Sequence, residues 1–444
     1  MEVSCKVDKY YSKNVKFIGY HDLCDRPGFQ MALQEAQGRY YLYVSHFRHS
    51  GWTILDVTDP ENPRFVRFVE GPNLSGQVTN KLQVADGLML CALGTGIPFL
   101  HGIGADDPYI AGLQIFDVKT DPENPKLLST WVAGKSQACD NICLGVHRFF
   151  YNGGRYAHLS STCDGFNNMI YRILDIGDPE YPVEVGRWWL PEQWEDGMLE
   201  KNRPQSEFPL SLPGMHGPPY VKDNLAYCGY NGAGVVIVDI SDVTRPQLVG
   251  HLPTYPTLGG KFSGARCHTV LPLSKRPYAI FTNEGERFWC FNKEIIGDQA
   301  QPINILGMLD VRNPADPTLI AVFPYPEVPE DFPYPNFNDC GIGCPGPFGP
   351  HNIHEPHDHP DLEDRNDRLY CCYFHAGLRI YDINDPFRPK EIAYFIPPNP
   401  KSVKFDCTYP GPMLGTTEDC VVDKRGYIYV DTFQDGVYIV KSEV

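Results

Sequence analysis

The sequence lacks the long apolar segments that membrane insertion or export requires. No stretch of its 444 residues approaches the length of a transmembrane helix. The first ten residues, Met-Glu-Val-Ser-Cys-Lys-Val-Asp-Lys-Tyr, contain no apolar core of a signal peptide. We therefore expect a soluble, cytoplasmic protein.

Clusters of lysine and arginine are also missing. The chain has 38 Lys and Arg against 55 Asp and Glu, which gives a formal net charge of −17. Because nucleic acids and anionic membrane surfaces bind basic patches, neither is an expected partner. The expected partner is a small-molecule substrate. The oligomeric state is left open, a homo-oligomer included.

Paired-cysteine and nucleotide-binding motifs are absent as well. The 15 cysteines include no Cys-x-x-Cys pair, and Cys340 and Cys344 lack the second pair that a zinc knuckle needs. No Gly-x-Ser-x-Gly, P-loop or dinucleotide-binding motif occurs, so nucleotide cofactors are unsupported. In a chain of this length without an export signal, we expect most cysteines to be reduced.

What the sequence does contain is a repeat. Gly377–Pro389 reads Gly-Leu-Arg-Ile-Tyr-Asp-Ile-Asn-Asp-Pro-Phe-Arg-Pro, an apolar run followed by Asp and a proline-containing turn. A second apolar run follows each complete copy, so each copy predicts two strands joined by a turn. The further copies are Gly51–Pro63, Gly112–Pro125, Ile170–Pro182, Gly234–Pro246, Ile305–Pro317 and the truncated Gly436–Val440. Seven copies predict an array of sheets.

The array is expected to close into one domain, an all-β, seven-bladed β-propeller spanning residues 1–444. Asn14–His21 matches the run that follows each turn, and the last copy lacks that run. The N-terminal strand should therefore complete the C-terminal blade and remove exposed sheet edges. The expected blades cover about residues 30–69, 83–131, 147–189, 216–252, 268–323, 351–395, and 418–440 with 14–21.

Two signatures link the chain to a known family. They are Gly-Val-Val-Ile-Val-Asp-Ile-Ser-Asp at Gly234–Asp242 and Asp-Ile-Asn-Asp-Pro at Asp382–Pro386. The chain resembles the LVIVD-repeat proteins, a group of seven-bladed β-propellers, over nearly its whole length. The resemblance implies the fold but no activity, because propellers serve as enzymes, sensors and scaffolds alike.

One position in each blade opens the first strand, which lines the central channel of a propeller. His216 and Glu418 fix the alignment, since each precedes its repeat position, Asp239 or Lys441, by the same interval of 23 residues. Side chains at this position should form a ring around the axis. The full set is Gln30, Gln83, His147, His216, His268, His351 and Glu418.

The ring predicts a metal site. Four imidazoles from consecutive blades would repel one another if protonated, and a bound cation would hold them neutral. We therefore predict one divalent transition metal, with iron favoured and zinc, copper or manganese as alternatives. The predicted ligands are His147, His216, His268 and His351. A structural role, in which each His bonds a neighbouring backbone group, is the alternative.

The four-His set is similar, in architecture only, to the iron centre of carotenoid cleavage oxygenases, which are also seven-bladed. That resemblance implies open coordination positions for dioxygen or substrate, with carboxylates behind the histidines. Glu418 would either take that outer role or bind the metal directly. The sequence motifs of the oxygenases are absent.

Further polar residues are candidates for proton transfer. Glu355 should share the face of His351, where it would bond a ring histidine or act as a general base. His49 and His375 stand at equivalent places before the repeat glycine, where they would contact substrate or only bond the turn. His357 and His359 follow Pro356 and are expected in a solvated loop.

These observations favour a cytoplasmic metalloenzyme that acts on a small organic molecule, with non-haem-iron-type oxygen chemistry first. A hydrolase or lyase that uses the ion as a Lewis acid is the second interpretation, with Glu355, Glu418 or His375 moving protons. The third is a non-catalytic scaffold with structural histidines.

The expected redox state of the cysteines can be measured directly. Thiol titration of the denatured protein under non-reducing conditions should count close to the 15 cysteines of the sequence. A count of only a few thiols would instead indicate a disulfide framework and an exported protein.

Overall fold

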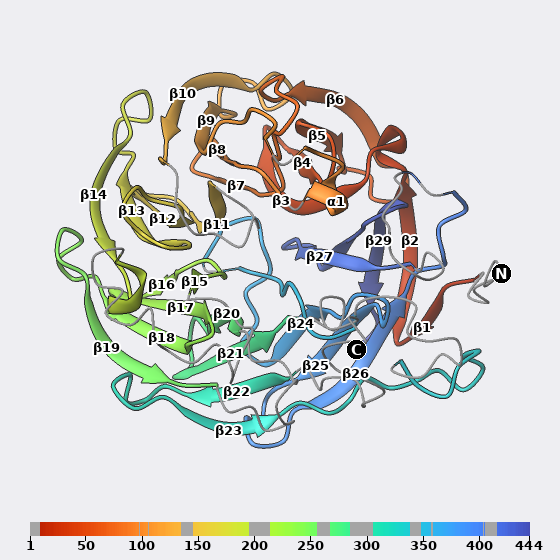
Figure 1. The fold of residues 1–444 in the computed structure, drawn as a ribbon. Helices are drawn as coiled ribbons and strands as arrows, with labels where there is room; N and C mark the ends of the chain where they lie inside the picture. Colours follow the sequence, from red (N-terminus) through yellow and green to blue (C-terminus); the bar gives the residue numbers. More distant parts are fainter. Residues whose placement is uncertain are drawn as a thin grey trace.

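A computed structural model describes residues 9–96, 98–104, 106–134, 145–194, 214–254, 267–284, 305–337, 348–356, 358–402, 404 and 415–444. These residues form seven antiparallel sheets arranged in a ring around a central axis (Figure 1). The predicted all-β, seven-bladed propeller is therefore confirmed. None of the helices in the described ranges is long and apolar enough to cross a membrane.

The first three blades each contain four consecutive strands. In blade 1 these are β3 (Gly28–Ala36), β4 (Arg39–His46), β5 (Gly51–Asp56) and β6 (Arg64–Glu70). Blade 2 contains β7 (Leu82–Ala85), β8 (Leu88–Leu93), β9 (Gly112–Asp117) and β10 (Lys126–Val132). Blade 3 contains β11 (Val146–Phe150), β12 (Tyr156–Ser161), β13 (Ile170–Asp175) and β14 (Val183–Trp188).

The remaining blades follow the same plan with local changes. Blade 4 contains β15 (Gly214–Met215), β16 (Tyr220–Lys222), β17 (Leu225–Asn231), β18 (Gly234–Asp239) and β19 (Gln247–Leu252). Blade 5 contains β20 (Cys267–Pro272), β21 (Tyr278–Asn283), β22 (Leu306–Asp310) and β23 (Thr318–Val322). Blade 6 contains β24 (Arg368–Cys372), β25 (Leu378–Asp382) and β26 (Lys390–Ile396), and blade 7 contains β27 (Thr417–Val422), β28 (Tyr427–Thr432) and β29 (Gly436–Ser442). Short helical turns are η1 (Leu23–Asp25), α1 (Pro98–His101) and η2 (Pro191–Gln193).

The repeat signature forms a buried strand and the turn that ends it. In β18 the apolar run is buried, and the carboxylate of Asp239 accepts a hydrogen bond from the Ser241 backbone N–H at 2.7 Å. Asp242 accepts from the N–H of Thr244 at 2.9 Å. Each aspartate thus satisfies a backbone donor two residues later, which fixes the direction of the chain into the outer strand.

The N-terminal segment closes the ring. β2 (Val15–His21) pairs with β29 from Val15 opposite Ser442 to His21 opposite Val437, as predicted. A second N-terminal strand, β1 (Tyr11–Lys13), pairs with β26 and adds an outer strand to blade 6, which the sequence did not indicate. Figure 1 shows these two strands beside the C-terminal blades.

The innermost strand is irregular in two blades because proline interrupts it. In blade 4, Pro218 and Pro219 separate β15 from β16. In blade 6 the innermost segment pairs with β24 at one isolated bridge, Ile353 opposite Cys371, between Pro350 and Pro356. Proline lacks the N–H that a ladder needs, so pairing stays short at both places.

The hydrophobic core lies between neighbouring sheets. One cluster joins blades 6 and 7 through buried side chains such as Tyr370, Ile380 and Val430, and it includes Val15 of β2. Another joins blades 1 and 2 through Trp52 and Met89. Because Val15 belongs to a core cluster, the closing strand contributes buried apolar area as well as hydrogen bonds.

Ring closure can be tested by truncation. Deleting residues 1–20 removes β1 and most of β2, and should cost several kcal/mol, a large fraction of the about 5–15 kcal/mol that usually stabilises a domain. The melting temperature should fall sharply, whereas Lys16→Ala, at an exposed position of β2, should leave it nearly unchanged. Equal melting temperatures for the truncated and intact proteins would contradict closure.

Candidate functional site

In blades 1, 3, 5 and 7 the first strand carries an irregularity that turns one residue out of the ladder. In blade 3 the register shifts between Val146 and Arg148, which leaves His147 in a bulge. In blade 5 the same shift, between Cys267 and Thr269, leaves His268 in a bulge. A bulge re-aims a side chain and ends regular pairing, so it presents these imidazoles to the axis.

The equivalent places in the other blades follow from the hydrogen bonds. His216 donates its N–H to Gly229 O at 2.9 Å, and His351 donates to Cys372 O at 2.8 Å. In blade 7 the shift between Thr417 and Cys420 contains Glu418. The four histidines and Glu418 therefore occupy one position in consecutive blades, as the sequence predicted.

The sequence alignment was wrong in blades 1 and 2. In blade 1 the shift falls between Gly28 and Met31, which places Phe29 at the position of the histidines, with Gln30 next to it. In blade 2, Leu82 pairs with Cys91 and Lys81 O accepts from Ala92 N, which places Asn80 there instead of Gln83. A bulge residue and an insertion alter the interval to the repeat aspartate, so counting from that aspartate fails.

The four imidazoles lie in a continuous arc. Ring centroids are 4.5 Å apart for His147 and His216, 4.4 Å for His216 and His268, and 4.6 Å for His268 and His351. The Nε2 atoms of His147 and His216 are 3.3 Å apart. Two nitrogens bound to one ion at about 2.1 Å lie roughly 3.0–3.4 Å apart, so this pair has the spacing of neighbouring ligands.

Glu284 is a further member of the site that the sequence did not reveal. One carboxylate oxygen lies 3.5 Å from His216 Nε2 and the other 3.7 Å from His351 Nε2. Among the described residues, ligand atoms of His216, His268 and Glu284 all lie within 4.8 Å of one another. Glu284 directly follows β21, at the start of an insertion without a counterpart in other repeats, so no pattern pointed to it.

Outer contacts fix the orientation of two of the imidazoles. His351 Nδ1 lies 3.0 Å from the backbone oxygen of Glu418 and 3.2 Å from its carboxylate. His268 Nδ1 lies 2.7 Å from Thr269 Oγ1. A proton on His351 Nδ1 leaves the Nε2 lone pair directed toward Glu284, which is the tautomer that a metal ligand needs.

A buried cation lies against His268. Arg148 is 1% exposed, and its Nη1 atom lies 3.2 Å from His268 Nδ1 and donates to Thr269 Oγ1 at 3.0 Å. Its Nη2 atom donates to Glu355 Oε1 at 3.0 Å. Glu355 also accepts hydrogen bonds from Tyr220 and Gln83. Arg148 thus stands between Glu355 and the imidazoles, and the carboxylate acts on them through it.

Burial shapes the protonation of the site. It lowers the pKa of all four ring histidines well below the usual value, so the imidazoles are neutral. It also raises the pKa of Glu418. His216 Nδ1 and Glu418 Oε2 have no hydrogen-bond partner among the described residues. Unsatisfied buried polar atoms beside neutral imidazoles are what a site for a cation and its bound waters would leave.

The other two histidine candidates, His375 and His49, have described partners outside the four ring histidines. His375 Nε2 bonds the backbone oxygen of Phe337 at 3.0 Å, within an aromatic cluster. His49 is exposed, and its ring centroid lies 6.1 Å from that of His46. The His375 imidazole thus bonds a residue 38 positions away in the chain rather than its own turn.

His359, in the loop after Pro356, is not exposed to solvent as expected, although its neighbours Asp358 and Pro360 are. His359 is buried; its Nε2 bonds Val84 O at 2.9 Å and its Nδ1 accepts from the Asp361 N–H at 3.2 Å. His359 therefore anchors this loop to blade 2. His354 is held in the same way, with Nε2 on Glu363 O at 2.7 Å and Nδ1 accepting from Val422 N at 3.2 Å. His357 lies outside the described residues.

Comparisons with known proteins agree with the fold. The LVIVD repeat model matches residues 220–254, which cover β16 to β19. No curated protein matches the sequence. The periplasmic gluconolactonase PpgL of Pseudomonas aeruginosa is similar in structure, with 10% identity, a TM-score of 0.51, and coverage of 96% of this chain and 99% of that chain.

Two further solved propellers are similar at lower scores. A streptogramin B lyase shares 10% identity and a TM-score of 0.48, covering 98% of both chains. Saccharomyces cerevisiae Sqt1 shares 8% identity and a TM-score of 0.48, covering 96% of this chain and 98% of that one. At 10% identity, the likeness to the gluconolactonase shows the fold alone.

A small polar cavity lies along the first strands, on the Glu355 side of the site. Its volume is about 50 Å³, and Gln30, Gln83, Glu355 and Asp419 contribute polar groups to its lining. Such a volume accommodates water. Burial first, and then the charge of Glu355, raise the pKa of Asp419 to about 7.

The pKa of Asp419 predicts a pH dependence of stability. The pKa of an aspartate in an unfolded chain is about 3.9. Between that pH and about 7 the folded protein binds the proton more tightly, so this residue stabilises the fold at low pH and the stability is lost as pH rises. In protein treated with a chelator, Asp419→Asn should reduce the change of the unfolding free energy with pH over this range. Asp25→Asn, at an exposed carboxylate, should not. Parallel wild-type and Asp419→Asn curves would contradict this.

Proposed function

We propose that the protein is a metalloenzyme that acts on a small organic molecule, with one divalent transition metal bound by the imidazole arc. The observation that supports it best is the convergence of His216, His268 and Glu284, extended by the 3.3 Å Nε2 contact of His147. His351, 3.7 Å from Glu284 through Nε2, would complete the set. Imidazole with one carboxylate suits iron, zinc, copper or manganese.

The charges around the arc also favour a cation. Among the described residues, five carboxylates act on one another here, namely Glu284, Glu355, Glu418, Asp419 and Asp431. The cations that offset them are Lys81, Arg148 and, for Asp431, Lys404. These five carboxylates, of which Glu418, Asp419 and Asp431 are buried, cannot all ionise beside three cations without a large desolvation penalty. A bound dication would reduce that penalty and hold the imidazoles neutral.

For the reaction class, we propose non-haem-iron-type oxygen chemistry first, on the four-imidazole set. When bound, the ion would provide coordination positions for dioxygen or substrate. The chain itself would hold the His351 tautomer through Glu418 and orient His268 through Thr269. It would also keep a fixed positive charge at Arg148, 3.2 Å from His268, where negative charge forming on a bound group would be stabilised.

A metal-dependent hydrolase or lyase is the second candidate, and Glu284 favours it. Its carboxylate lies between two imidazole Nε2 atoms, where it would accept a proton from a water or substrate polarised by the ion. In this reading Glu284 is a base rather than a ligand. A non-catalytic scaffold remains the third candidate, in which the imidazoles bond only one another and the backbone.

Metal analysis of protein purified without an affinity tag tests the proposal. We expect close to one transition-metal ion per chain, with iron or copper favouring redox chemistry and zinc favouring hydrolytic or lyase chemistry. His268→Ala should lose most of the metal and keep the fold. Glu284→Gln should lose a comparable share if Glu284 is a ligand, and retain it if Glu284 is a base.

Matched histidine variants separate metal loss from general damage. His354 is buried, as His268 and His351 are, yet both its nitrogens bond the backbone. His354→Ala should lower the melting temperature and keep the metal. Glu418→Gln, which changes the contact behind His351, should weaken metal binding by about 10–100-fold. Full-length protein without metal, and ring variants that behave like His354→Ala, would support the scaffold instead.

A further inference from the structure

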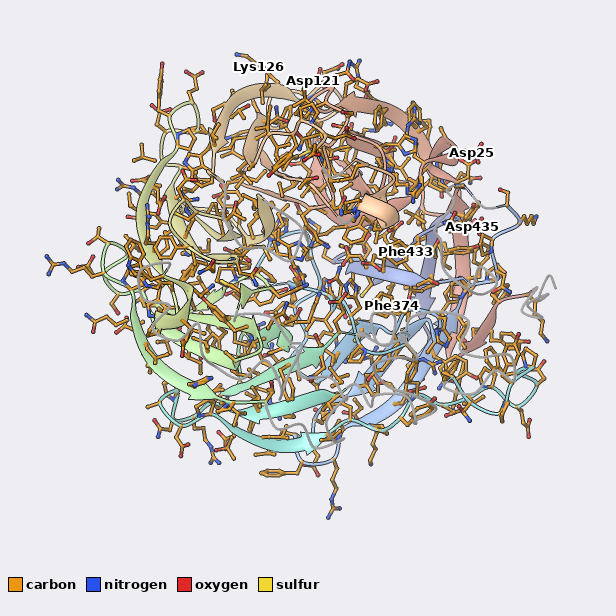
Figure 2. All side chains as sticks on the ribbon, viewed as in Figure 1. Asp25, Asp121, Lys126, Phe374, Phe433 and Asp435 are labelled. Carbon is orange, nitrogen blue, oxygen red and sulfur yellow. The ribbon has the colours of Figure 1, made fainter. Side chains whose placement is uncertain are left out.

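A groove of about 560 Å³ runs along the outer edge of blade 3. One side of it is formed by β14 and the residue that follows, from Glu184 to Trp189, and the other by the turn Thr244–Pro246 of blade 4. Figure 1 shows β14 on the outside of the ring, and Figure 2 shows side chains projecting outward from that edge. The volume is within the range of about 300–1,000 Å³ that is usual for ligand sites.

The strand β14 presents an unpaired edge to this groove. Its inner side pairs with β13, and no described strand pairs with its outer side. An edge of this kind carries a row of backbone N–H and C=O groups with which another strand can pair. A peptide of about six residues in extended conformation would match the length of β14.

The protein itself adds a strand to an outer edge in blade 6. There β1 pairs with β26 over three residues. Lys9 and Lys13, beside and within β1, form ion pairs with Asp331 and Glu327. A short basic segment thus binds an outer edge whose flank is acidic, and the same mode is available at blade 3 to a segment of suitable charge.

The groove at blade 3 carries a surplus of positive charge. Arg245 is exposed, and its guanidinium makes neither an ion pair nor a hydrogen bond within the part of the chain that the structure describes. Arg187 is held in place, because its Nε donates to Glu184 Oε1 at 2.6 Å and its Nη1 lies 3.2 Å from Cys163 Sγ. Glu184 is also paired with the buried Arg172, so its charge is already compensated. The groove therefore favours an acidic ligand.

Two tryptophans add apolar surface to the groove. Trp188 and Trp189 are half-buried and line it. The Trp188 ring lies 5.8 Å from that of Tyr230 in blade 4, and the Trp189 ring lies 5.0 Å from that of Phe166, so packing fixes both indoles. Tryptophan and arginine are the side chains on which binding energy is most often concentrated in protein interfaces. A protein segment is thus the ligand that this lining fits.

We propose that the groove along β14 binds an acidic peptide segment of a partner protein, which adds to blade 3 as an outer strand. The backbone of the segment pairs with β14, its carboxylates bind Arg187 and Arg245, and its apolar side chains pack on Trp188 and Trp189. The groove lies on the outermost strand of the blade, whereas His147 lies on the innermost strand. The proposal is therefore independent of whether the imidazole arc binds a metal.

Fluorescence anisotropy of labelled peptides on the full-length protein tests the proposal. The probe alternates Glu and Val over six residues, which places the carboxylates on one face of a strand and the valines on the other. One control peptide has Lys in place of Glu, and a second keeps Glu but carries N-methyl groups on the backbone nitrogens. We expect saturable binding of the Glu–Val peptide. Each control should bind about tenfold more weakly, because the first has the wrong charge and the second lacks N–H donors.

A matched pair of arginine variants locates the binding. Arg388 stands before Pro389 in blade 6 as Arg245 stands before Pro246 in blade 4, and both arginines are exposed. Arg245→Glu should weaken the Glu–Val peptide by about threefold to tenfold, and Arg388→Glu should leave it within about twofold. Since both positions are exposed, both variants should keep the melting temperature of the intact protein.

The outcomes that overturn the proposal are distinct. If the Glu–Val peptide does not saturate, or the Lys–Val peptide binds as tightly, the groove is not a site for an acidic segment. If the N-methylated peptide binds like its parent, the segment does not add as a strand. Equal effects of Arg245→Glu and Arg388→Glu would place the binding elsewhere than on β14.

Discussion

Pairing of β2 with β29 is the constraint on which the rest of the molecule depends. Without β2, blade 7 would leave the edge of β29 unpaired. The register of the two strands runs from Val15 opposite Ser442 to His21 opposite Val437. Closure fixes the distance of every innermost strand from the axis. Four imidazoles from four different blades lie 4.4–4.6 Å apart in sequence order only because of that common distance.

Within that ring the site depends on buried charge. Carboxylates outnumber cations near the arc, the imidazoles are neutral, and several polar atoms have no partner among the described residues. A fold does not keep such groups buried without compensation, and they persist where function requires them.

The fold could be predicted because its signal repeats. Each Asp ending a strand accepts a hydrogen bond from a backbone N–H two residues later, so the turns have a sequence requirement that shows in most copies.

Part of the site could be predicted as well. The positions of His216, His268 and Glu418 were predicted correctly from their alignment with the repeat. Phe29 and Asn80 were missed because bulges and an insertion change the residue count without leaving a composition signal. Glu284 was missed because it is brought to the arc by tertiary structure, from the end of β21, with no repeat counterpart. The polar residues around His359 suggested solvent exposure, although two backbone contacts bury that imidazole.

The pairing of β2 with β29 also determines when, during synthesis, the ring of blades can close. β2 is synthesised before its partner β29, which follows more than 400 residues later in the chain. At about 5–20 residues per second, β2 waits for tens of seconds before its partner is synthesised. During that interval an open strand edge with apolar residues is exposed to other nascent chains. The last blade is thus the point at which chaperone protection would matter most for this protein.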